Sequence, residues 1–175
     1  MISASGVKVT FTQPKAIATG ASGPPVAVVE IPMLVRDEPV WQWHTSFEAN
    51  GSATGNARVH TRTQLTMAHW RGEVDHAAQI AARVMDNAER HSVPPPRARL
   101  GFRLAGIATG ELLVEVTDPL PEFPGFVEAV TWEPTDGALP RGLWLVRQLG
   151  ARLSYAVAED GLSKVVQALV PGAPV

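Results

Sequence analysis

The chain has 175 residues, a formal net charge of −2, and hydrophobic residues at 45% of its positions. This length suits one domain with a buried core, and the composition is that of an ordinary globular protein. The near-neutral charge provides no basic field that would attract nucleic acid or an anionic membrane surface. The chain has no cysteine, which excludes disulfides, thiolate metal sites and cysteine nucleophiles.

The longest apolar run does not predict a membrane span. It covers Val26–Val35 and is interrupted by Glu30 and Pro32, so it is far shorter than the roughly 20 residues that cross a bilayer. The N-terminus also lacks the long apolar stretch of a secretory signal. We therefore expect a cytoplasmic protein with neither a membrane nor a nucleic acid as partner.

The first part of the chain is less regular than the rest. Residues 1–25 are rich in Gly, Ser, Ala, Thr and Pro, which predicts a flexible N-terminal arm with a candidate short strand at Val7–Thr12. Residues 26–175 are expected to form a single domain. Within it, Val26–Val35 is typical of a buried strand, and Val40–His44 is a second candidate strand.

Two helices are predicted after a loop of small residues at 50–56. The first covers about residues 57–70 and has a thin apolar face. The second ends before the three prolines that start at Pro94, and acidic residues near its start favour the positive end of the helix dipole. Its apolar residues recur at helical spacing: Ala77, Ile80, Ala81, Val84, Met85 and Ala88.

The next two segments alternate in the manner of β-strands. In residues 97–104, apolar side chains take one face and arginines the other. After a turn near residues 106–110, the side chains of Leu112, Val114 and Val116 share one face, on which Asp118 also falls. The pair predicts an antiparallel hairpin with Asp118 pointing inward.

The last part of the chain predicts a helix followed by two strands. A loop rich in proline and glycine leads to a helix near residues 141–149, with Gly150 as its C-terminal cap. Strands at residues 153–158 and 163–170 are joined by a turn at Glu159-Asp160-Gly161. The order of elements predicts an α/β (α+β) two-layer sandwich, in which a mainly antiparallel mixed sheet carries helices on one face.

Three segments carry a family resemblance. Residues 81–91 read Ala-Ala-Arg-Val-Met-Asp-Asn-Ala-Glu-Arg-His, residues 114–119 read Val-Glu-Val-Thr-Asp-Pro, and residues 141–146 read Arg-Gly-Leu-Trp-Leu-Val. They resemble the N-box helix and the two glycine boxes of the gyrase, histidine kinase and MutL ATPases, most closely in the bacterial anti-sigma-factor serine kinases. The resemblance covers about residues 57–170 and implies the histidine-kinase-like ATPase (Bergerat) fold.

The resemblance also implies a site for ATP and magnesium. Asn87 would bind magnesium through its side-chain oxygen, a hard donor that suits a hard cation. Asp118 would accept a hydrogen bond from the adenine amino group. Gly142, next to Arg141, would open a helix that receives phosphate oxygens, and Lys164 stands where a threonine normally supports the adenine site.

Three of these residues also have a simpler interpretation. Asn87 would be an exposed helix residue bonded to His91, Asp118 would start a turn at Pro119, and Gly142 would be a glycine required by packing. In the same way, Trp41 and Trp43 are predicted as aromatic residues of the core or its rim, and the alternative is an exposed patch that binds a protein.

Several positions depart from the family pattern. The residue one turn before Asn87 is usually glutamate, the general base, but it is Arg83 here, which cannot lose its proton and would repel a metal ion. The loss of a positioned base costs a factor of roughly 10² to 10⁴ in rate. Arg83 either forms an ion pair with Asp86 or a neighbour, or clamps a phosphate directly. Pro119-Leu120 and Pro140 replace glycines of the two boxes.

Together these features predict a regulatory ATP-binding-type domain that is catalytically impaired and acts through protein–protein interaction. The implied partner is a sigma factor or an anti-sigma antagonist, and a homodimer stays open because members of the family often dimerise. The alternative is an active protein serine/threonine kinase that uses ATP and magnesium to phosphorylate an anti-sigma-factor antagonist. The departures from the family pattern leave open whether ATP and magnesium bind.

Overall fold

The computed structural model describes residues 38–91, 98–131, 142–158 and 161–173, which all belong to one compact unit, residues 31–175. Several predictions fall outside the described residues: the arm at 1–25, the candidate strands at Val7–Thr12 and Val26–Val35, and Arg141. The turn at residues 159–161 is described only at Gly161.

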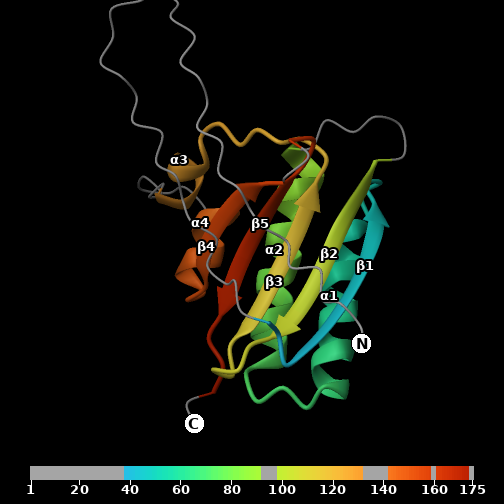
Figure 1. The fold of residues 1–175 in the computed structure, drawn as a ribbon, viewed down its shortest axis with the longest axis vertical. Helices are drawn as coiled ribbons and strands as arrows, with labels where there is room; N and C mark the ends of the chain where they lie inside the picture. Colours follow the sequence, from blue (N-terminus) through green and yellow to red (C-terminus); the bar gives the residue numbers. More distant parts are fainter. Residues whose placement is uncertain (1–37, 92–97, 132–141, 159–160, 174–175) are drawn as a thin grey trace, which may run out of the picture. The chain divides into compact units, whose positions relative to one another are not determined.

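Five strands form one antiparallel sheet in the order β1-β2-β3-β5-β4 (Figure 1). The strands are β1 (Trp41–Glu48), β2 (Arg99–Gly106), β3 (Leu112–Asp118), β4 (Arg152–Val157) and β5 (Lys164–Val170). All four pairings between the described strands are antiparallel, so the parallel component of the expected mixed sheet is absent from this part of the chain. β1 continues four residues beyond the predicted end at His44.

The helices are α1 (Ala53–Met67), α2 (Val74–His91), α3 (Phe126–Thr131) and α4 (Gly142–Gln148). α1 and α2 pack against each other on one face of the sheet, and α4 packs beside α2 (Figure 1). The apolar face predicted for α2 is buried as expected. The main core lies between these helices and the sheet, and includes Ile80, Met85, Phe102, Leu104, Val114 and Val166. The two-layer α+β class is thus confirmed.

The short helix α3 was not predicted, because its residues were assigned to the loop before α4. It has six residues, too few to show helical periodicity, and proline and glycine precede it. Phe126 is buried, with its ring centroid 5.1 Å from that of Phe123 and 4.7 Å from that of Tyr155. Aromatic packing of this kind, rather than local propensity, places the helix.

The first two tryptophans pack at the rim of the core. Trp41 and Trp43 are partly buried against it, and the ring of Trp43 stacks on His60 with centroids 5.3 Å apart. The interpretation as core or rim residues is therefore confirmed, and the exposed patch is wrong.

The face of the sheet away from the helices is more buried than the predicted alternation of apolar and polar residues implies. Leu113 and Glu115 alternate with the inward-facing residues of β3, so the strand pattern places them on the opposite face from the core, yet their exposed fractions are 2% and 8%. Glu115 forms an ion pair with Arg103 on β2 and accepts a hydrogen bond of 2.7 Å from Gln167 on β5. These residues are direct neighbours in the strand register, so polar groups on this face satisfy one another across strands.

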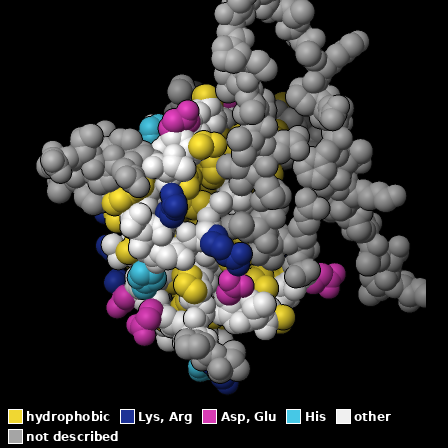
Figure 2. Space-filling view, turned by 90° about the vertical axis from the view of Figure 1, so that its left-hand side faces the viewer, with side chains coloured by type: hydrophobic (Ala, Val, Ile, Leu, Met, Phe, Trp, Pro, Cys, Tyr) yellow, Lys and Arg dark blue, Asp and Glu magenta, His cyan; other side chains and the backbone are white. Residues whose placement is uncertain are grey.

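None of the described helices has both the length and the apolar character that a membrane span requires. On the face turned to the viewer in Figure 2, basic and acidic side chains lie among hydrophobic ones and do not form one basic field.

The start of α1 depends on a carboxylate that the sequence did not single out. α1 begins at Ala53 rather than at residue 57, and Glu89 of α2 accepts hydrogen bonds from the backbone N–H groups of Gly51, Ala53 and Thr54 at 2.7 to 3.2 Å. The Thr54 hydroxyl donates a fourth, at 2.8 Å. Partial burial acts to raise the pKa of Glu89, but these hydrogen bonds outweigh it and hold the pKa below its usual value.

Replacement of Glu89 by glutamine should therefore destabilise the domain. We expect a loss of about 1 kcal/mol in the free energy of unfolding at pH 7, the typical value of a helix N-terminal cap, measured by urea denaturation. Because the folded pKa lies below the unfolded one, the contribution is complete above the unfolded pKa and disappears as the pH falls through the folded pKa. Glu48→Gln is the control, since among the described residues the one ion pair of the Glu48 side chain is an exposed contact of 3.8 Å with Arg99. Equal losses in the two variants would contradict the capping role.

Candidate functional site

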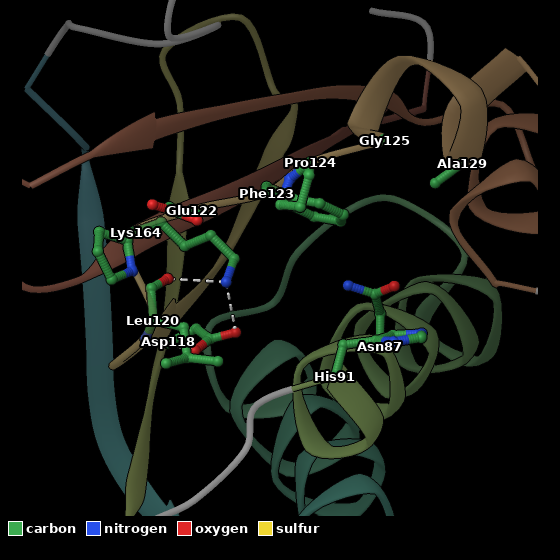
Figure 3. A pocket seen from close by; sticks show the side chains of 11 residues that line it. Asn87, His91, Asp118, Leu120, Glu122, Phe123, Pro124, Gly125, Ala129 and Lys164 are labelled. Carbon is green, nitrogen blue, oxygen red and sulfur yellow. Dashed lines mark hydrogen bonds and ion pairs between the residues drawn. The ribbon is translucent and has the colours of Figure 1, made fainter.

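A cavity of about 630 Å³ lies between the C-terminal part of α2 and the end of β3 (Figure 3). Its volume is in the range of small-molecule sites. Asn87 and His91 of α2 lie on one side of it, and Asp118 and Lys164 lie on the other. The remaining lining residues are Leu120, Pro121, Glu122, Phe123, Pro124, Gly125 and Ala129.

Asp118 and Lys164 form a buried ion pair at the wall of this cavity. They face each other in the register of β3 and β5, and their exposed fractions are only 1% and 4%. Lys164 Nζ donates to Asp118 Oδ2 at 2.8 Å and to the carbonyl oxygen of Leu120 at 2.8 Å. The same ammonium group lies 5.4 Å from the ring centroid of Phe123. The predicted inward direction of Asp118 is confirmed.

The turn proposed at Asp118 is also present. The backbone N–H of Leu120 donates to Asp118 Oδ1 at 2.8 Å, which is the bond typical of an aspartate that starts a turn. Each carboxylate oxygen thus holds one donor, and each can accept a second. Asp118 therefore both starts a turn and lines the cavity, with an exposed fraction of only 1%.

The wall around Asp118 is largely apolar. The cavity presents apolar side chains from the 119–125 segment and from Ala129, and Asp118 is the buried acceptor among them. The difference from the expected site is that Lys164 already neutralises the carboxylate.

Asn87 lies where this cavity meets a second one. It is buried, with an exposed fraction of 8%, so the interpretation as an exposed helix residue is wrong. The second cavity, of about 560 Å³, shares Asn87, His91 and Ala129 with the first. Its other lining residues are Arg83, Asp86, Arg90, Glu128, Gly142 and Leu143. The two cavities therefore adjoin at Asn87.

Arg83 lines the second cavity but does not form the ion pair that was predicted. Asp86 instead accepts from Arg90, with 2.8 Å between Oδ1 and Nε, because Arg90 lies one turn further along the same helix. Within the described part of the chain, no hydrogen bond or ion pair involves the side chain of Arg83. Among the described residues, its guanidinium group is thus unpaired on the cavity side of α2.

Gly142 begins α4 and also lines the second cavity. Its φ of +63° lies in the left-handed region, and a Cβ added there would meet no atom within 4 Å. The backbone conformation explains the glycine, and the interpretation as a glycine required by packing is wrong.

The residues around Asn87 offer magnesium a weak set of ligands. Magnesium in nucleotide sites is usually held by one or two carboxylates together with phosphates. Here the amide oxygen of Asn87 is uncharged, Asp86 is paired with Arg90, and Arg83 adds a positive charge. Glu128 of α3 is thus the one carboxylate without an ion pair among the described residues that line the second cavity. Among the described residues, no group of three or more His, Cys, Asp or Glu side chains is placed to hold a metal ion.

A third cavity, of about 530 Å³, lies at the other end of α2, between residues 70–76 and 170–173. It contains none of the residues of the three motifs.

A scan of this chain against protein-family models gives no match, and a search of curated proteins gives none either.

The ion pair at the cavity wall predicts a double-mutant result. Lys164→Met should lower the free energy of unfolding by about 3–5 kcal/mol, because it leaves a buried carboxylate without its counter-ion. Asp118→Leu combined with Lys164→Met should recover much of this loss. Both are measured by chemical denaturation, with Arg99→Met on the exposed side of β2 as a control expected to cost less than about 1 kcal/mol. A double variant that is no more stable than Lys164→Met would show that the two groups are not energetically coupled.

Proposed function

We propose that this domain is a regulatory module that binds a nucleotide-like ligand and does not transfer a phosphoryl group. The observation that carries the proposal is the pair of adjoining cavities that meet at Asn87, with the buried carboxylate of Asp118 in one and the guanidinium of Arg83 in the other. A planar base in the first cavity and an anionic tail in the second would use both.

The positions of the motifs support this proposal. The segments that resemble the N-box and the two glycine boxes are far apart in the sequence, yet each contributes residues to these two cavities: Asn87 from α2, Asp118 from β3 and Gly142 from α4. Residues that resemble a nucleotide site therefore lie around one continuous space. A site for ATP is the simplest interpretation of that arrangement.

Loss of phosphoryl transfer is supported by the side chain at position 83. A general base must lie within hydrogen-bond reach of the attacking group and must accept its proton, and an arginine cannot do so. Asp86, the nearest carboxylate on α2, is held by Arg90. We therefore propose regulation through protein–protein interaction, and the family resemblance favours a sigma factor or an anti-sigma antagonist as partner.

One observation favours the alternative, an active kinase. Glu128 of α3 lines the second cavity and is exposed, so its carboxylate is a candidate base from a different element. In that case turnover would depend on Glu128.

Ligand binding is tested by the thermal stability of the full chain with ATP. At a concentration one hundred times the dissociation constant, ATP should stabilise the fold by about 2.7 kcal/mol, or a shift of about 5–10 °C in Tm for a domain of this size. Ala129→Trp should abolish the shift because it fills the space between α3 and Asn87. Ala108→Trp, in an exposed turn, is the matched control. No saturable shift in the unsubstituted protein would contradict the proposal.

The absence of phosphoryl transfer is tested separately by release of ADP from ATP, with the candidate partner proteins present. We expect a rate no higher than that of Ala129→Trp, since the usual base is missing. A rate well above that background that is lost in Glu128→Gln would establish the active kinase instead.

A further inference from the structure

Some of the charged side chains around the second cavity form an ion pair with each other, and others do not. On α2, Asp86 and Arg90 neutralise each other at 2.8 Å. This leaves Arg83 and Glu128 as the charged groups that line the cavity without an ion pair to any described residue, with His91 at the boundary to the first cavity. Arg83 is four residues before Asn87, so the two side chains lie one above the other on the same face of the helix.

The position of Arg83 relative to the first cavity suits contact with the tail of a ligand. Because the two cavities adjoin at Asn87, a ligand with its ring near Asp118 would pass Asn87 before it reaches Arg83. A guanidinium group is always charged and binds two phosphate oxygens at once in a planar arrangement. It therefore supplies both the charge and the hydrogen bonds that a polyphosphate needs.

A divalent cation would find few ligands and an unfavourable positive charge at the same place. Asn87 offers one neutral oxygen, the carboxylate of Asp86 is already paired, and Arg83 lies one helical turn from Asn87. A magnesium ion held by Asn87 would be repelled by the guanidinium group, and Glu128 of α3 is the one carboxylate without an ion pair among the described residues that line the second cavity.

On the basis of the proposed function, we infer that Arg83 takes the place of magnesium as the counter-ion for the ligand's polyphosphate. Binding of a nucleotide to this domain then requires no divalent cation. Lys164 and Asp118 hold the base end, and Arg83 holds the anionic end, with Asn87 between them as a neutral hydrogen-bonding group.

The test is a calorimetric titration of the full chain with ATP, once in excess EDTA and once in excess magnesium chloride. The unsubstituted protein should bind ATP with comparable affinity in both. Arg83→Glu should weaken binding in EDTA by about tenfold or more, the loss expected for a charged hydrogen bond, and magnesium should restore part of it. Arg83→Gln should show an intermediate loss with no gain from magnesium.

Arg58→Glu is the matched control, because Arg58 is an exposed residue of α1 that lines neither cavity. It makes the same change of charge and should leave both titrations unaltered. Inorganic tripolyphosphate in EDTA serves as a second probe that lacks the base. It should bind the unsubstituted protein and Arg58→Glu, and bind Arg83→Glu more weakly.

The contradicting results distinguish the two proposals. If ATP binds the unsubstituted protein only with magnesium, or if Arg83→Glu binds ATP in EDTA as well as Arg58→Glu does, the role of Arg83 is wrong and the nucleotide site stands. If neither ATP nor tripolyphosphate binds under either condition, both proposals are wrong.

Discussion

Lys164 and Asp118 face each other across β3 and β5, on the helix-covered side of the sheet, where almost no water reaches them. A buried ion pair is tolerated only when further hydrogen bonds satisfy the remaining donors and acceptors. The backbone N–H and carbonyl groups of Leu120 supply those bonds. The pair thus fixes the start of the 119–125 segment, which forms the wall of the first cavity opposite Asn87.

Under the proposed function, the site departs from a magnesium-dependent phosphoryl-transfer site in its charges. The cavity between the α2 helix and the end of β3 is open, and Asn87 and Asp118 both line it. Arg83 lines the second cavity, and the carboxylate of Asp118 is paired with Lys164. Under the proposed function, both features favour neutral or anionic ligands that arrive without a metal ion.

The sequence predicted what depends on periodicity, and missed what depends on tertiary contact. The α2 face and the inward direction of Asp118 follow from regular spacing, and both are confirmed. The N-terminal cap by Glu89 joins positions 35 to 38 residues apart, so no local pattern reveals it. The ion pair between Asp118 and Lys164 could have been predicted, because Lys164 lies on the buried face of its own strand. Only the side-chain geometry shows that Asp86 pairs with Arg90 and not with Arg83.

The proposed function requires that a ligand enters the space between Asn87 and Asp118. The most direct measurement is a titration of the isotope-labelled protein with ATP, observed through the ¹⁵N–¹H resonances of backbone amides and of the Asn87 side chain. The account predicts saturable shifts at Asn87 and at the amides of residues 118–123, and none at residues 70–76 beside the third cavity. Shifts confined to residues 70–76, or none at saturating ATP, would contradict it.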